Sequence, residues 1–169
     1  MSARIKEYAG TPLREEDLKQ GKVLLVSYWP KAKYVWSAGV AIGRYLTELK
    51  NGRIIGRQCD KCGRIVVPPR MFCEWCFRPN DRWIILKDSG VVNTFSISHI
   101  AADATRIKEP LIPAVIQIDG TTNAGILHLV GETDPEDARF GMKVQALWKP
   151  PEERTGSVTD IKYFKPIGR

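Results

Sequence analysis

The sequence lacks most of the residue patterns with which enzymes do chemistry. Its 169 residues contain no phosphate-binding glycine loop, no nucleophile-elbow serine and no dinucleotide-binding fingerprint. It has only two histidines, His99 and His128, and neither lies near a cysteine or within a zinc-ligand motif such as H-E-x-x-H. A general base also needs a partner that orients it, and the sequence displays none for these histidines, so both are predicted to be structural. The sequence therefore predicts no catalytic residue in this chain.

The sequence also lacks a long apolar stretch. A transmembrane helix needs about 20 consecutive apolar residues, and no run approaches that length. The chain starts with Met-Ser-Ala-Arg and has no apolar signal segment there. We therefore expect a cytoplasmic protein that does not bind a membrane and whose thiols stay reduced.

Cysteine is scarce but regularly spaced. The pattern is C-x2-C-x10-C-x2-C, and its members are Cys59, Cys62, Cys73 and Cys76. Two residues between paired cysteines allow a tight turn that directs both sulfurs at one ion, and two such turns complete the ligand set of structural zinc. We therefore expect one structural zinc ion. A closed site with four thiolates has no open position for water or substrate, and it leaves no free thiol to act as a nucleophile.

Two other uses of the four cysteines compete with zinc. A pair of disulfides would require an oxidising compartment, and the expected cytoplasmic location argues against it. Iron in a rubredoxin-like redox site would use the same sulfurs, because tetrahedral sulfur coordination suits either metal. The sequence ranks zinc first and leaves iron, with an electron-transfer function, as an alternative.

The positive charge of the chain is unevenly distributed. The formal net charge is +7, and Lys and Arg outnumber Asp and Glu by 14 to 6 in residues 1–70. Residues 71–169 contain 12 basic and 13 acidic residues. A basic first part favours anionic partners in general, including nucleic acid, acidic protein surfaces and phosphate-bearing cofactors.

The first 52 residues are predicted to form an arm and a helix. Residues 1–36 are irregular, and we expect an extended arm with one short strand at the apolar run 23–26. Residues 37–52 are expected to form an amphipathic helix that is capped by Ser37 and ends at Asn51-Gly52. Its apolar stripe consists of Ala38, Ile42, Tyr45, Leu46 and Leu49. The stripe packs either on the chain's own core or on a partner, and we interpret the segment as a docking helix.

The rest of the chain is predicted to form a metal-binding ribbon and a β domain. Residues 53–82 contain the four cysteines and form the zinc ribbon. Residues 83–169 contain five predicted strands, at 91–100, 114–119, 125–130, 143–148 and 158–164. With one short helical insertion at 134–140, they indicate an OB-type barrel, and a five-stranded sandwich fragment is the competing architecture. The expected fold class is mainly β with an N-terminal helix, a zinc ribbon and a five-stranded OB-type barrel.

Several motifs, taken in order, resemble one family of small proteins. They are Trp36-Ser37-Ala38-Gly39, the first cysteine knuckle in residues 56–64, Val67-Pro68-Pro69-Arg70, Cys73-Glu74-Trp75-Cys76 and Ser89-Gly90-Val91-Val92. This family joins an N-terminal helix, a rubredoxin-like zinc ribbon and a C-terminal OB fold. The match covers residues 36–165, and the leader of residues 1–35 goes beyond the family's minimal form.

The resemblance implies an accessory subunit rather than a free-standing enzyme. Members of the family are partners of thiolase-like acyl-CoA enzymes, so it implies a hetero-oligomer with a thiolase-like catalytic subunit that handles the acyl-CoA. The longer leader makes the chain most similar to the branch that serves benzoylsuccinyl-CoA thiolase in anaerobic toluene degradation. Other branches serve acetoacetyl-CoA thiolase with hydroxymethylglutaryl-CoA synthase, or sterol side-chain hydratases and aldolases. Basic residues of the first part would then help to bind the phosphates of coenzyme A at the interface.

Single-stranded nucleic acid is the alternative partner. OB barrels and zinc ribbons both bind it, and residues 28–34 interleave aromatic rings with cations as a stacking platform does. However, residues 91–130 contain only Arg106 and Lys108 as cations, whereas OB domains that bind oligonucleotides present basic groups on their strands. The sequence therefore ranks nucleic acid below a thiolase-like protein.

Overall fold

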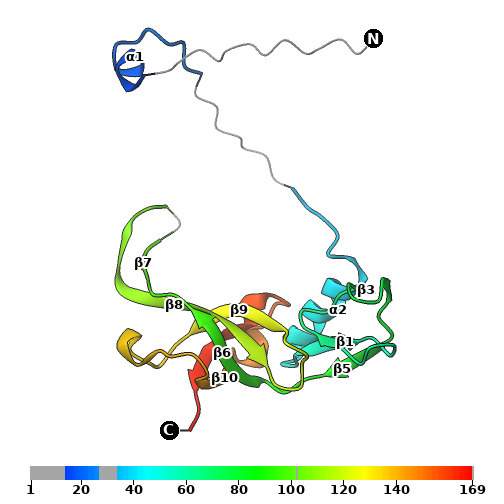
Figure 1. Cartoon of the computed structure of the whole chain (residues 1–169). Coiled ribbons are helices and arrows are strands. Elements are labelled where there is room, and N and C mark those ends of the chain that lie inside the picture. The colour runs from blue at the N-terminus through cyan, green and yellow to red at the C-terminus, as the bar shows by residue number, and fades with distance from the viewer. Residues whose placement is uncertain (1–13, 27–33, 102, 169) are drawn as a thin grey trace, which may run out of the picture. The chain divides into compact units, whose positions relative to one another are not determined.

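The computed structural model describes residues 14–26, 34–101 and 103–168. The chain divides into two compact units, Met1–Trp36 and Ser37–Arg169. All strands of the described residues belong to the second unit (Figure 1). Within the part of the chain that the structure describes, no helix is long and apolar enough to cross a membrane.

The first unit contains one short helix, α1 (Glu15–Lys19). Its first turn is acidic, which is favourable beside the positive end of the helix dipole, and Lys19 pairs with Glu15 at 2.8 Å. The prediction of a strand at residues 23–26 is wrong, and the expected extended arm contains a helical turn instead. No strand within the described residues pairs with this run, and an unpaired strand is not stable alone. Residues 28–33 of the predicted aromatic platform lie outside the described residues.

The second unit starts with helix α2 (Gly39–Lys50). Ser37 Oγ accepts a hydrogen bond from the N–H of Gly39 at 3.2 Å, but the N-cap position itself is Ala38, so the helix begins one residue later than predicted. The helix ends at Lys50 with Asn51 as its C-cap, as the Asn-Gly pair predicts.

The predicted apolar stripe of α2 is divided between the core and the surface. Tyr45 and Leu49 are buried in the main hydrophobic core, and Leu46 packs against it. Ile42 is partly exposed, and Val40, which the predicted stripe did not include, is 68% exposed. Most of the stripe therefore covers the chain's own core, and only the N-terminal part of the helix presents apolar side chains at the surface.

The ribbon consists of two small antiparallel sheets. In the larger one, β1 (Ile55–Gln58) lies between β2 (Ile65–Val66) and β5 (Arg82–Ile85). In the smaller one, β3 (Phe72–Cys73) pairs with β4 (Arg78–Pro79). The two sheets place the first and second cysteine pairs at neighbouring turns.

Five strands close into a barrel, in the order β6 (Ser89–Phe95), β8 (Arg106–Ile118), β9 (Gly125–Val130), β11 (Ile161–Pro166) and β10 (Lys143–Trp148). β10 pairs back to β6, and every pairing is antiparallel except that of β9 with β11. The closed barrel confirms the predicted OB-type architecture over the sandwich fragment. The first half of β8 continues beyond the barrel as a hairpin with β7 (Ser98–Ile100), as Figure 1 shows.

The strand predictions differ in accuracy along the barrel. The strands at 125–130 and 143–148 match β9 and β10 at both ends. The predicted strand 91–100 is interrupted after Phe95, and 114–119 is the end of the longer β8. Part of the predicted insertion at 134–140 is a 3-10 turn, η1 (Pro135–Asp137), and η2 (Pro151–Glu153) is another. The last predicted strand begins as a third turn, η3 (Val158–Asp160), because Ser157 and Asp160 form a capping box there.

One hydrophobic core serves α2, the ribbon and the barrel. Ile54, Ile55 and Val67 of the ribbon region belong to the same buried cluster as Phe164 of β11. Backbone hydrogen bonds also join the parts, since the N–H of Thr122 donates to the carbonyl of Ile65 at 3.0 Å. Such a shared core fixes the ribbon on the barrel.

Glycine is required at one close approach within the barrel. A Cβ atom at position 90 of β6 would lie 2.2 Å from the carbonyl oxygen of Gln117 on β8, which is far inside van der Waals contact. Gly90 therefore allows β6 and β8 to pair closely and complete the barrel.

Burial of Tyr45 predicts a loss of stability in alkali. Desolvation raises the pKa of the Tyr45 phenol to about 12, against about 10 in an unfolded chain. Because the raised pKa favours the neutral phenol in the folded state, its contribution is complete below pH 10 and is lost as the pH rises toward 12. We expect Tyr45→Phe to reduce the decline of the unfolding free energy over this range, measured by urea denaturation at several pH values. An identical decline in both proteins would contradict the assignment.

Candidate metal centre

Two turns of the ribbon carry the four predicted cysteines. The first knuckle, Cys59 to Cys62, follows β1, and the N–H of Gly63 donates to the carbonyl of Cys59 at 2.8 Å. The second knuckle, Cys73 to Cys76, starts in β3, and the N–H of Phe77 donates to the carbonyl of Cys73 at 2.9 Å. Each cysteine pair is therefore held by the same tight backbone turn.

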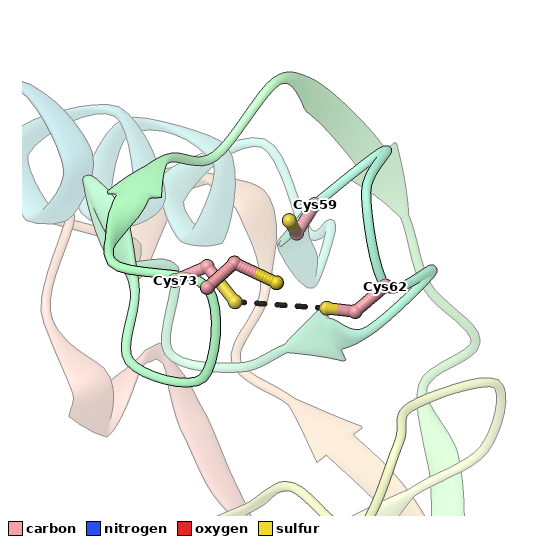
Figure 2. A group of neighbouring side chains, drawn as sticks. Cys59, Cys62 and Cys73 are labelled. Carbon is pink, nitrogen blue, oxygen red and sulfur yellow. Dashed lines mark hydrogen bonds between the residues drawn. The ribbon is translucent and has the colours of Figure 1, made fainter.

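The four sulfurs gather at one point. All four Sγ atoms lie within 4.8 Å of one another, and those of Cys62 and Cys73 are 3.6 Å apart. Figure 2 shows this pair bridging the two knuckles, with Cys59 close by. A tetrahedral ion with zinc–sulfur bonds of about 2.3 Å would separate its sulfurs by about 3.8 Å. The four cysteines are thus positioned to bind one metal ion.

The acidities of two thiols also favour a cation in this cluster. Hydrogen bonds from the backbone N–H groups of Cys62 and Lys61 stabilise the Cys59 thiolate and lower its pKa to about 7. Burial raises the pKa of the Cys76 thiol to about 12, and the neighbouring sulfurs act in the same direction. The Cys59 and Cys76 thiolates therefore coexist readily only when a cation offsets their charge, as a bound divalent ion does.

Carboxylates neutralise the arginines around the cluster. Glu74 accepts hydrogen bonds from both Arg64 and Arg70, and this pairing lowers the pKa of its carboxyl. Two further ion pairs lie within the ribbon. Arg78 pairs with Asp81 at 3.0 Å, and Arg82 pairs with Asp60 at 2.6 Å. The arginines around the cysteines are thus engaged within the ribbon itself.

A buried arginine, which no sequence motif indicated, holds two residues that flank the second knuckle. Arg57 of β1 donates to the carbonyl of Asn80 and to the sulfur of Met71, and its guanidinium lies 4.8 Å from the ring centroid of Trp83. The side chain of Asn80 donates in turn to the carbonyl of Arg70 at 2.8 Å. The only sequence signal was a cation two residues after the apolar pair Ile54-Ile55.

The two histidines lie outside the metal cluster. The Nδ1 atom of His128 accepts a hydrogen bond from the N–H of Leu129, so Nε2 carries the proton toward the carbonyl of Val158, 3.2 Å away. Its ring packs edge-on against Phe164. His99 is exposed on β7. His128 thus has the contacts of a structural residue.

Comparisons with known proteins assign both parts of the second unit. The family model described as ChsH2, rubredoxin-like zinc ribbon domain, matches residues 47–82, and that described as ChsH2, C-terminal OB-fold domain, matches residues 83–149. A DUF35 domain-containing scaffold protein of Methanocaldococcus jannaschii is 32% identical over 117 residues, which are 68% of this chain and 82% of that protein. The chain belongs to the DUF35 family. The predicted order of zinc ribbon and OB fold is therefore confirmed.

Solved structures of DUF35 proteins share the fold. A DUF35 protein of unknown function from Sulfolobus solfataricus has a TM-score of 0.56 and 23% identity with this chain. The match covers 76% of this chain and 83% of that protein's chain. The Ltp2-ChsH2(DUF35) aldolase has a TM-score of 0.54 and 17% identity with this chain. The match covers 73% of this chain and 91% of the matched chain. At these identities the likeness establishes the fold and not the activity.

Proposed function

We propose that this chain is a non-catalytic, zinc-containing accessory subunit of a thiolase-type acyl-CoA enzyme complex. The observation that carries the proposal is the convergence of all four cysteines on one cluster. Thiolytic cleavage of a carbon–carbon bond needs a nucleophilic cysteine with an acid–base partner, and a cysteine that ligates zinc cannot act in that way. The catalytic cysteine would therefore lie on another subunit.

The family relationship supports a role in assembly. The relative from Methanocaldococcus jannaschii is called a scaffold protein. The name of the solved Ltp2-ChsH2(DUF35) aldolase joins a DUF35 protein with an enzyme. A catalytic partner is therefore consistent with both relatives. The thiolase class, and benzoylsuccinyl-CoA as the substrate of the complex, rest on the sequence resemblance and form the specific part of the proposal.

Exposed apolar side chains provide the means of attachment. In the first unit, Leu24, Val26 and Trp36 are exposed, as is Val40 of α2 in the second. Soluble proteins expose such side chains in groups mainly where a partner covers them. In the proposed complex, the arm and the N-terminal part of α2 contact the catalytic subunit. Zinc is held by the four cysteines, Cys59, Cys62, Cys73 and Cys76. The barrel shapes the entrance for acyl-CoA. Basic residues of the first part would bind the phosphates of coenzyme A.

Affinity purification of the full chain at native expression level tests the proposal. We expect a thiolase-like protein among the co-purifying proteins identified by mass spectrometry, together with about one zinc ion per chain. Recovery of nucleic acid, or of this chain alone, would contradict the accessory role. Iron in place of zinc would give a coloured protein and would favour electron transfer instead.

A further inference from the structure

The two cysteine knuckles have the same backbone turn but differ at one position. The residue after the first knuckle is Gly63, with φ of 72°, and the residue after the second is Phe77, with φ of 50°. Both donate their N–H to the carbonyl of the first cysteine of their knuckle. Both positions therefore need a left-handed backbone, which glycine adopts freely and which a residue with a Cβ atom adopts only with strain.

Phe77 gains no compensating burial within the described residues. Its side chain is 90% exposed, so the strained residue contributes little to packing in this chain. Strained backbone positions tend to persist where function requires the side chain. A large aromatic ring in this position indicates a contact outside the chain.

Phe77 is accompanied by other exposed apolar side chains. Phe72 and Trp75 are 62% and 63% exposed, and Met71 is also exposed. These four residues, which we call the second-knuckle surface, lie within residues 71–77. The guanidinium of Arg64 lies 4.4 Å from the ring centroid of Trp75, and Glu74 binds Arg64. Trp75 is therefore held in place before any partner binds, which lowers the entropy cost of association.

The charges of the ribbon indicate what covers this surface. Residues 59–82 contain five basic and three acidic side chains, and four thiolates on a divalent ion would add two negative charges. Arg64, Arg70, Arg78 and Arg82 are each paired with a carboxylate. A nearly neutral apolar surface is complementary to a neutral apolar pocket on a protein, whereas the phosphates of a nucleic acid require free cations.

We infer that the second-knuckle surface inserts into an apolar pocket of the catalytic partner, with Phe77 as the anchoring side chain. The inference rests on the proposed accessory function and specifies where the partner binds. It places the main contact on the ribbon, whereas the sequence placed it on the helix of residues 37–52. Aromatic side chains at the centre of an interface often carry most of its binding energy.

Phe77→Gly tests the inference because it removes the ring and the strain together. We expect zinc content to be unchanged and Tm to be equal to or higher than that of the wild type. Binding to the catalytic protein that co-purifies with the wild-type chain, measured by biolayer interferometry, should weaken by about tenfold or more. Phe77→Ala keeps the left-handed strain without the ring and should weaken binding equally.

Phe140→Ala is the matched control, because the side chain of Phe140, in the turn before β10, is also largely exposed, at 68%. It should bind as the wild type does. Equal affinity of Phe77→Gly and the wild type would overturn the inference while leaving the proposed function intact. A wild-type chain that recovers no catalytic protein would overturn both. The inference would also fail if Phe77→Gly lost only affinity for an oligo(dT) probe, or only self-association in size-exclusion chromatography.

Discussion

The Cys73→Ser variant is expected to lose its metal ion and, with it, the folded structure of both knuckles. Cys73 is buried, and its sulfur lies 3.6 Å from that of Cys62. A serine hydroxyl does not replace a thiolate at a zinc site, and structural zinc contributes on the order of 10 kcal/mol to the folding of small zinc domains. Zinc should fall from about one ion per chain to none. Hydrogen exchange at the knuckle amides of Gly63 and Phe77, which bond to Cys59 and Cys73, should rise to the level of an unfolded segment.

The barrel should remain folded in this variant, because the ribbon residues that pack into the shared core, Ile54, Ile55 and Val67, lie outside the two knuckles. Phe164 and the buried residues of β8 belong to this core, so their amide protection should persist. Lys61→Ala is a suitable control, since Lys61 is an exposed residue inside the first knuckle and only its backbone bonds the Cys59 sulfur. It should retain zinc. A zinc-free Cys73→Ser protein that still binds its catalytic partner would refute the role given to the metal.

Asp160→Asn is expected to destabilise the barrel by about 2 kcal/mol, through lost hydrogen bonds to a charged group. The Asp160 carboxylate is buried and accepts three backbone hydrogen bonds, from Thr155 at 3.0 Å, Gly156 at 2.7 Å and Ser157 at 3.1 Å. Both of its oxygens are used. An asparagine keeps one acceptor and turns its NH₂ group toward a backbone N–H, which leaves a buried donor without a partner. Urea denaturation would measure the change.

The same carboxylate predicts an acid dependence of stability. Desolvation opposes ionisation of Asp160, but its three backbone donors outweigh this effect and lower its pKa. Because the pKa is lower in the folded than in the unfolded chain, the stabilisation is present above about pH 4 and is lost as the pH falls further. The Asn variant should lack this acid dependence.

Asp103→Asn is the matched control for Asp160. Asp103 also accepts hydrogen bonds from a residue close in sequence, Thr105, but it is exposed in the turn between β7 and β8. Its substitution should change stability little. If both variants lost equal stability, burial of the Asp160 network would not be the cause.

The features that depend on local sequence could be predicted best. The spacing of the cysteines fixes which side chains can reach one ion, so Cys59, Cys62, Cys73 and Cys76 were located without the structure. The strands predicted at 125–130 and 143–148 also match β9 and β10 at both ends. These features follow from neighbouring residues alone.

The features that depend on distant contacts could not be predicted. The periodicity of α2 gave an apolar stripe, but only the packing of Tyr45 and Leu49 shows that this stripe covers the chain's own core. Asp160 lies within the predicted strand at 158–164, and no local pattern indicated that it caps a turn and is fully buried. Phe77 has a left-handed backbone in a turn that carries glycine, Gly63, at the equivalent position of the first knuckle. Only the backbone angles reveal this strain.

The core that α2, the ribbon and the barrel share has an evolutionary consequence. Two family models meet at residues 82 and 83, as if two modules had been joined there. Yet Ile54, Ile55 and Val67 pack into one cluster with Phe164, so a cut at that boundary would expose apolar surface on both fragments. A chimera that exchanged the barrel between relatives would therefore also have to exchange the ribbon residues that pack against it, Ile54, Ile55 and Val67. With this packing, we expect the ribbon and the barrel to be inherited as a pair.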